Sequence, residues 1–247
     1  MSLTEINIRE KNFHNELQSK KKGRFENVFY KALYNIHEDF FDFLKDNAKN
    51  SEILDYGCGV GSFVEKVINF SPKRIVGIDI SEVSINKARE KIKKSKNNAN
   101  FLVDNCEKTK FENNSFNIVY GSGILHHLKI NECLDEIHRI LKPNGDLLFI
   151  EPLGTNPIIN FYRRLTPKSR SIDEHPFVNK DFEYINNKFV KIKIKYYGFL
   201  TLLFFPFYKS PADSKVFKLL SNLDQFLFRF KIFKLFAWSV LISAKKN

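Results

Sequence analysis

The sequence predicts an α/β fold, in which helices flank a doubly wound, mostly parallel sheet and a helical, phenylalanine-rich insert precedes the last strand. Short apolar runs typical of buried strands alternate with helical patterns between residues 52 and 150. A glycine-rich turn joins the first strand pattern to the first helix that follows it. Strands and helices repeated at this interval give a parallel sheet with helices on both faces. Ligands of such sheets bind at the carboxyl ends of the strands, where we expect the functional site.

The amino-terminal part predicts a helix and then the glycine-rich turn. Residues 1–24 are polar, and apolar residues recur on one helical face from Phe25 to Leu44. A buried strand at 53–54 then leads into Asp55 and into three glycines, which are Gly57, Gly59 and Gly61. Glycine lets a ligand approach the main chain without meeting a Cβ. Dinucleotide loops are spaced G-x-G-x-x-G, whereas this loop is G-x-G-x-G, and a carboxylate at Asp55 would repel a pyrophosphate but could hold an ammonium group.

Further strand patterns end in polar residues or glycine. The strands are expected at 74–80, ending in Asp79 and Ile80; at 100–106, ending in Asp104, Asn105 and Cys106; at 116–120, before Gly121; and at 146–150, before Glu151. The intervening helices are expected at 63–70, 82–94 and 131–141. An aspartate at the end of the second strand can accept both hydroxyls of a ribose. Asp104 could accept the exocyclic amine of adenine.

The carboxyl-terminal part breaks the simple alternation. It predicts a helix at 153–165, an irregular loop at 166–177, a helix at 181–188, an alternating strand at 190–197 and a final strand at 238–244. The insert at 198–236 includes an amphipathic helix from Lys215, with apolar positions at Val216, Leu219, Leu220, Leu223, Phe226, Leu227 and Phe230. The insert could roof the active site, pair with a second subunit or dock on a membrane surface.

The motifs in combination resemble those of the class I S-adenosylmethionine-dependent methyltransferases, in particular the broad small-molecule (methyltransferase type 11-like) group. The residues that carry the resemblance are the D-x-G-C-G-x-G loop at 55–61, the L-H-H-L turn at 125–128, R-I-L-K-P-N-G at 139–145 and Glu151-Pro152. The resemblance covers residues 50 to 152, and it departs from the family at Asn117, where an aspartate of structural role is usual. It implies a Rossmann-like sheet of seven strands, with the seventh antiparallel beside the fifth.

The resemblance also implies the ligand. S-adenosyl-L-methionine would be the cofactor and S-adenosyl-L-homocysteine the product. The implied cofactor-binding residues are Asp55, Gly57, Gly59, Gly61, Asp79, Ile80, Asp104, Asn105, Cys106 and Gly121. In the family a leading helix packs over the cofactor pocket, so Phe25, Tyr30 and Tyr34 either form a lid or only cover the sheet.

Transfer of the methyl group to a hydroxyl requires a base, and histidine is suited to that role because its ordinary pKa is about 6.5. We expect His175 to be the base, since it lies past the fifth strand beside two carboxylates. His126 and His127 are the alternatives, with catalytic or structural roles, and Glu151 would orient the acceptor or cap its strand. Three arginines near His175 would suit an anionic acceptor or remain solvated, and these are Arg163, Arg164 and Arg170. No metal is expected, because the acidic residues lie at separate strand ends and the Cys and His spacing does not suit zinc.

Composition and charge leave two acceptor classes open. The formal net charge is +12, yet no RNA-binding module or base-amine motif is recognisable, so no nucleic-acid partner is expected. An NAD oxidoreductase would need a different glycine spacing. The first hypothesis is O-methylation of a sugar or of a phosphorylated or nucleotide-linked tailoring intermediate, such as one of a surface polysaccharide. The alternative is methylation of a lipid or isoprenoid quinone-type acceptor at a membrane surface.

We expect a single domain over residues 1–247, of which 43% are hydrophobic and 28% charged. Within it, residues 1–50 would form an amino-terminal helical lid, 51–152 the cofactor-binding core and 153–247 the acceptor-side half. The three cysteines form no disulfide framework and no apolar leader follows Met1, so a cytoplasmic location is expected. Peripheral membrane contact and a homodimer formed through the insert are the two macromolecular contacts left open.

Overall fold

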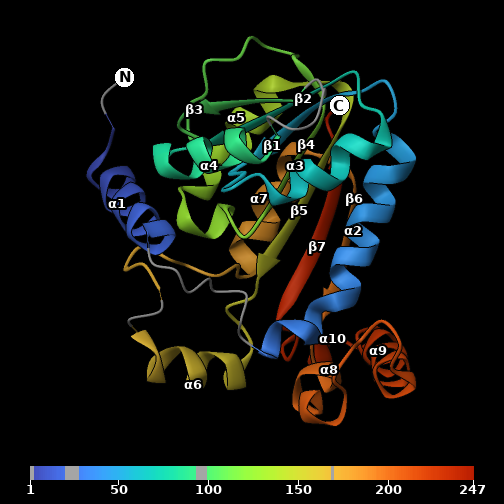
Figure 1. The fold of residues 1–247 in the computed structure, drawn as a ribbon. Helices are drawn as coiled ribbons and strands as arrows, with labels where there is room; N and C mark the ends of the chain where they lie inside the picture. Colours follow the sequence, from blue (N-terminus) through green and yellow to red (C-terminus); the bar gives the residue numbers. More distant parts are fainter. Residues whose placement is uncertain (1–2, 20–27, 93–98, 168–169) are drawn as a thin grey trace.

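The computed structural model describes residues 3–19, 28–92, 99–167 and 170–247 and shows a seven-stranded sheet flanked by helices (Figure 1). The strand order is β3-β2-β1-β4-β5-β7-β6. The strands are β1 (Glu52–Tyr56), β2 (Arg74–Asp79), β3 (Ala99–Val103), β4 (Phe116–Ser122), β5 (Leu141–Pro152), β6 (Val190–Tyr197) and β7 (Ser239–Lys245). The first five strands pair in parallel, and β7 pairs antiparallel with β5 and β6. The predicted fold class is therefore confirmed.

Helices bury both faces of this sheet, because successive side chains of a strand point to opposite faces. On one face α2 (Tyr34–Asn47), α3 (Ser62–Val67) and α4 (Glu82–Ile92) pack against Ile53 and its neighbours. On the other face α5 (Ile130–Ile140) and α7 (Asn179–Lys188) pack against Leu54 and its neighbours. Short 3₁₀ helices follow α3, at η3 (Ile68–Phe70), and β4, at η4 (Leu125–His127). The two apolar layers hold the carboxyl ends of β1 to β5 along one edge.

A helix whose bounds the sequence pattern did not give, within the predicted amino-terminal helical lid, covers part of this edge. This helix, α1 (Glu5–Ser19), has buried polar residues on its inner side, among them Asn7 and Glu10. The helix predicted at 25–44 is instead the 3₁₀ helix η2 (Val28–Leu33) followed by α2, and Phe25 lies outside the described residues. The ring of Tyr30 lies 5.3 Å from that of Trp238, and the ring of Tyr34 lies 6.1 Å from that of Phe217. These two tyrosines therefore pack on Trp238, just before β7, and on the insert.

The remaining helices lie together at one end of the molecule (Figure 1). They are α6 (Pro157–Leu165), α8 (Leu200–Leu203), η6 (Phe205–Phe207), α9 (Lys215–Leu227) and α10 (Lys231–Lys234). Within the described residues, no helix combines the length and the apolar character that are needed to cross a bilayer. Asp224 of α9 is buried and accepts hydrogen bonds from the backbone N–H groups of Phe199 and Leu200.

The apolar face predicted for the helix from Lys215 is not the face that packs. Phe217 and Asp224 of α9 are buried, whereas Leu219, Leu223 and Phe226 are exposed. The physical reason is that Asp224 satisfies the free N–H groups at the start of α8, which fixes the rotation of α9 about its axis. The insert contacts η2, α2 and β6. For example, Asn35 Nδ2 of α2 donates a hydrogen bond to Ser221 Oγ of α9.

Candidate active site

In the turn between β1 and α3, one of three glycines has free space next to its backbone. Gly57, Gly59 and Gly61 have φ angles of +76°, +51° and +73°, which side chains with a Cβ rarely adopt. A Cβ on Gly57 would lie 2.4 Å from Cγ1 of Ile124, so this position needs glycine for packing. A Cβ on Gly59 would meet no atom within 4 Å. The open side of Gly59 is therefore where a ligand can approach the main chain.

Two aspartates at the ends of neighbouring strands flank this opening. Asp79 accepts hydrogen bonds from the backbone N–H of Gly59 at 3.0 Å and of Ser81 at 2.8 Å. Asp104 accepts from the backbone N–H groups of Asn105 and Lys110, both at 3.0 Å. Burial raises the pKa of Asp79, which these N–H groups partly oppose. Each carboxylate oxygen keeps a second acceptor position for a hydroxyl or an amine.

Asp55 is a buried carboxyl group beneath the glycine turn. The hydroxyl of Tyr120 donates a hydrogen bond to Asp55 Oδ2 at 3.2 Å. Burial raises the pKa of Asp55 to about 8, against the opposing effect of the Tyr120 hydroxyl. A cation brought next to this carboxyl group would lower that pKa again. The predicted contact between Asp55 and an ammonium group therefore stays a prediction, which a lowered pKa of Asp55 on ligand binding would support.

The other predicted cofactor residues lie around the same opening but serve packing as well. Ile80 follows Asp79 and is half-buried. Cys106 is buried, and its carbonyl oxygen accepts a hydrogen bond from the hydroxyl of Tyr56. A Cβ on Gly121 would lie 2.6 Å from the ring of Phe149, so glycine at this position allows the close packing of β4 and β5.

Helix α1 is attached to the cofactor side by polar contacts. Ser81 Oγ donates to Asn15 Oδ1 at 2.6 Å, and Asn105 Nδ2 donates to Asn7 Oδ1 at 3.2 Å. Asn7 Nδ2 in turn donates to Glu107 Oε2 at 3.0 Å. Hydrophobic periodicity could not reveal this helix, because the side chains that it buries here are polar. The recurrence of Asn7, Glu10 and His14 at i, i+3 and i+7 is the signal that marks its inner face.

The strongest catalytic geometry in the described part of the chain joins β5 to the L-H-H-L turn. Glu151 is fully buried and accepts hydrogen bonds from the backbone N–H groups of Ile124 at 3.1 Å and Leu125 at 2.9 Å. His126 Nδ1 lies 2.7 Å from Glu151 Oε2. Burial raises the pKa of Glu151 to about 7, which the two N–H groups partly oppose. A carboxylate bonded to Nδ1–H fixes the histidine tautomer in which Nε2 is the basic nitrogen.

The second histidine of the turn faces α1 instead. His127 Nδ1 lies 3.2 Å from Glu10 Oε2, and His14 Nε2 lies 3.5 Å from the same oxygen. Burial alone would raise the pKa of Glu10, but the contacts with the two rings lower it well below its usual value. The side chains of Glu10, His14 and His127 each have an atom that could bind a metal ion, and these atoms lie within 4.8 Å of one another. The contacts of Glu10 with His127 and His14 attach α1 to the L-H-H-L turn.

His175 reaches this site through its backbone, and its side chain is exposed. Its N–H donates to the carbonyl oxygen of His126 at 2.8 Å, while its ring Nδ1 lies 3.1 Å from the carbonyl oxygen of Asp173. The carboxylate of Asp173 binds Arg9 of α1 at 2.7 and 2.8 Å. Among the predicted catalytic residues, the structure thus brings His126, His127 and Glu151 together and leaves the His175 ring at the surface.

Two of the three predicted anion-binding arginines are engaged within the fold. Arg163 donates to the carbonyl oxygen of Leu153 at 2.8 Å, and burial lowers its pKa to about 10. Arg170 donates to the carbonyl oxygen of Arg163 and lies 3.5 Å from a carboxylate oxygen of Glu174. Arg164 is exposed.

A separate cleft of about 540 Å³ lies between β6, α7 and α10. Its lining includes Tyr196, Phe182, Lys231 and Lys234, and none of the residues of the His126–Glu151 pair or of the glycine turn. We assign the active site to the carboxyl edge of β1 to β5 because the ordered carboxylates and the buried histidine lie there.

Comparison with known proteins agrees with this geometry. A family model described as "Methyltransferase domain" matches residues 53–145. The chain is 30% identical over 190 residues to Uncharacterized protein MJ0638 of Methanocaldococcus jannaschii, which covers 74% of this chain and 78% of that protein. It is 33% identical over 119 residues to 24-methylenesterol C-methyltransferase 2 of Arabidopsis thaliana, covering 47% of this chain but only a third (33%) of that relative.

Among solved structures, the geranyl diphosphate C-methyltransferase of Streptomyces coelicolor A3(2), in complex with Mg²⁺, geranyl diphosphate and S-adenosyl-L-homocysteine, superposes with a TM-score of 0.69. The sequence identity is 14%, over 99% of this chain and 98% of that chain, so this likeness concerns the fold. The chain belongs to the class I S-adenosylmethionine-dependent methyltransferases. The chain spans less than two thirds of the length of most of the curated relatives it matches, for example 33% of the Arabidopsis protein.

Proposed function

We propose that the chain is an O-methyltransferase in which His126 is the general base and Glu151 orients it. The observation that carries this proposal is the 2.7 Å contact between His126 Nδ1 and the buried Glu151 carboxyl group, at the carboxyl ends of β4 and β5. Two further backbone N–H groups fix Glu151, so the imidazole is held in one orientation. His175, which the sequence favoured, has an exposed ring, and this favours His126.

The residues of the cofactor edge fit S-adenosylmethionine. Asp55 would pair with its ammonium group, Asp79 with the ribose hydroxyls and Asp104 with the adenine amine, and Gly59 leaves room for close approach. The bound cofactor supplies an electrophilic methyl group on a sulfonium.

His126 Nε2 would take the proton of the acceptor hydroxyl, and the acceptor oxygen would receive the methyl group that the bound cofactor would supply. Glu151 stabilises the imidazolium that results, and the proton then passes to water. Burial of the pair and coverage by α1 limit the access of water.

Two acceptor classes remain in the proposal, each with one supporting observation. The exposed guanidinium of Arg164, after β5, supports a sugar or a phosphorylated or nucleotide-linked compound. The exposed apolar residues of α6, among them Phe161 and Leu165, support a lipid or isoprenoid quinone-type acceptor. The name of the sterol C-methyltransferase above agrees with the second class in the kind of acceptor, although that enzyme is directed at carbon. Since Arg163 and Arg170 are bound within the fold, the second class has the stronger support.

The proposal is tested by measuring S-adenosylhomocysteine release with hydroxylated acceptors of both classes. His126→Ala should lower kcat by about 10²–10⁴, the usual contribution of a general base. His175→Ala is the matched control, because its ring is exposed, and it should keep most of the turnover. A rate loss confined to His175→Ala would overturn the assignment of the base. Methylation of nitrogen or carbon acceptors alone would overturn the O-methyltransferase proposal.

A further inference from the structure

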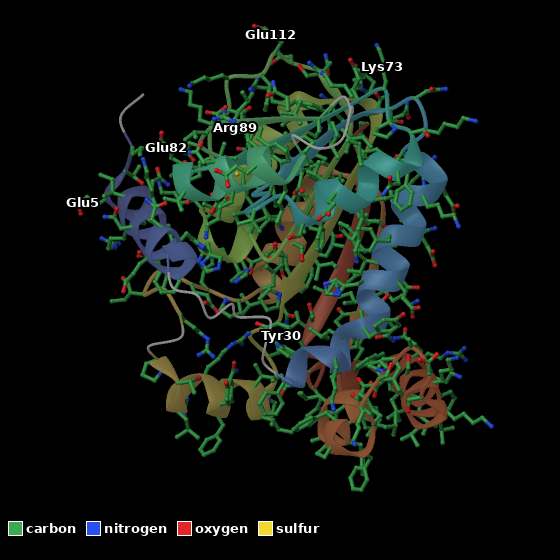
Figure 2. The ribbon with its side chains drawn as sticks, viewed as in Figure 1. Glu5, Tyr30, Lys73, Glu82, Arg89 and Glu112 are labelled. Carbon is green, nitrogen blue, oxygen red and sulfur yellow. The ribbon has the colours of Figure 1, made fainter. Side chains whose placement is uncertain are left out.

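Large apolar side chains are exposed together at the end of the molecule formed by α6 and the insert. We call this surface the apolar end. Its members are Ile158, Phe161, Tyr162 and Leu165 of α6, and Leu203, Phe204, Phe207, Val216, Leu219, Leu223, Phe226, Phe230, Ile232 and Leu235 of the insert. The most exposed are Phe207 at 72%, Leu165 at 66% and Phe161 at 63%. Figure 2 shows side chains of α6 and of the insert projecting from this end into solvent, with Tyr30 at the junction between them.

The two parts of the apolar end are joined through η2. The ring of Phe29 lies 5.7 Å from that of Tyr162 of α6 and 4.6 Å from that of Phe205 of the insert. Beneath them, Ile159 of α6 and Leu202 of α8 share a buried cluster with Ala32 of η2. The exposed residues of α6 and of the insert therefore belong to one surface, which rests on this shared buried cluster.

The helices of this surface present apolar residues outward while their inner sides are already filled. In α6 the exposed positions recur at i, i+3, i+4 and i+7, whereas Ile159 points into the fold. In α9 the exposed Leu219, Leu223 and Phe226 lie opposite the buried Phe217. Soluble monomers rarely leave so many large apolar residues together at the surface, so this face requires a partner.

The charges around the apolar end identify the kind of partner. Lys209, Lys215, Lys218, Arg229 and Lys231 are exposed in the insert, and Arg164 is exposed in α6. Within residues 198–236, all of which the structure describes, the acidic residues are Asp213 and Asp224, and Asp224 is buried. An apolar surface with a basic border matches an anionic bilayer. A second copy of the chain fits less well, because a two-fold interface would place like charges opposite one another.

We propose that the apolar end docks the chain on the surface of an anionic lipid bilayer, with α6 and α9 lying in the plane of the headgroups. Helices of this kind bury one apolar side at the boundary between headgroups and acyl chains without crossing the membrane. Since α6 begins five residues after β5 ends, docking brings the acceptor side of the active site to the membrane surface. The bilayer then also supplies an amphiphilic acceptor; this last step rests on the proposed function, whereas the docking does not.

The test is co-sedimentation of the full chain with phosphatidylcholine vesicles that contain or lack phosphatidylglycerol. Binding should require the anionic lipid and weaken as salt is raised. The combined variant Lys215→Glu, Lys218→Glu, Arg229→Glu should lower the partition coefficient at least about a hundredfold, because each basic residue near an anionic surface contributes a factor of about five. Phe161→Ser with Phe207→Ser should also abolish binding, and both positions are exposed, so the fold should persist.

Matched controls lie on other surfaces. Lys45→Glu with Lys49→Glu reverses two exposed charges on and after α2, and Val190→Ser removes an exposed apolar residue at the start of β6. Both variants should bind vesicles as the parent chain does, and so should His126→Ala, which separates docking from catalysis. Equal binding by the apolar-end variants and the controls, or no binding at all, would overturn the proposal. A dimer in light scattering that the Phe161 and Phe207 changes dissociate would assign the surface to a second copy instead.

Discussion

Replacing Glu151 by glutamine should remove catalysis while leaving the cofactor side intact. The amide oxygen of Glu151→Gln can still accept from the N–H groups of Ile124 and Leu125. Its NH₂ group would face His126 Nδ1, which must then become the acceptor and place its hydrogen on Nε2. A histidine in that tautomer cannot take a proton from the acceptor, so kcat should fall about 10²–10⁴-fold, or about 3–5.5 kcal/mol of barrier. Because burial raises the pKa of Glu151, its negative charge costs folding stability, so Glu151→Gln should not lower the free energy of unfolding at neutral pH.

Two measurements separate this loss from unfolding. Initial rates at saturating cofactor and acceptor give kcat, and calorimetric titration with S-adenosylhomocysteine gives the affinity, which should not change. The pH profile carries further information, because burial raises the pKa of Glu151 to about 7 and the parent rate should rise through that region. Turnover of Glu151→Gln close to that of the parent chain would refute the reasoning, since it would show that His126 works without a carboxylate partner.

Three further predictions concern the cofactor edge and metals. Asp79→Ala should weaken cofactor binding by about 1.5–3 kcal/mol, the scale of a charged hydrogen bond; unchanged affinity in calorimetry would contradict it. Burial raises the pKa of Asp55 to about 8, above its unfolded value. Its neutral form therefore favours the folded state, and this contribution is lost as pH rises from about 4 to about 8. Thermal unfolding of the ligand-free chain should show this fall, and a curve of equal slope for Asp55→Asn would exclude the assignment. Chelators should leave activity unchanged, because the sulfonium of the proposed cofactor is already an activated methyl donor and the proposed base is a histidine; activity lost and then restored by zinc or manganese would place an ion between Glu10, His14 and His127.

The sheet was predictable because its strands carry local signals. The alternation of apolar residues and lysines gave β6 with its correct bounds, from Val190 to Tyr197. The carboxyl ends of the parallel strands could also be placed, since Asp79 and Glu151 each follow an apolar run. Residues at these ends share one edge whatever the packing of the helices, and for this reason the edge proposed to bind the cofactor could be named from the sequence.

Side-chain orientation could not be predicted in the same way. The contact between Glu151 and His126 joins residues 25 positions apart and depends on the register of β4 against β5. His175 had attractive neighbours in the sequence, but its loop turns the ring outward while its backbone binds His126. The bounds of helix α1 were missed because its buried side chains are polar, and the outward face of α9 depends on Asp224, whose partners are distant in the chain.

The position of β7 determines how the two halves of the enzyme come together during folding. β6 is an edge strand whose sheet partner is β7, and β7 separates it from β5. Asp146 of β5 and Lys245 of β7 are 99 positions apart, so this pairing closes a long loop and we expect it to form late. The parallel strands β1 to β5 can assemble first. At that stage α6 and the insert, which carry the apolar end, follow β5 in the chain but are not yet packed against β6 and β7. That interval is when the chain is most open to aggregation.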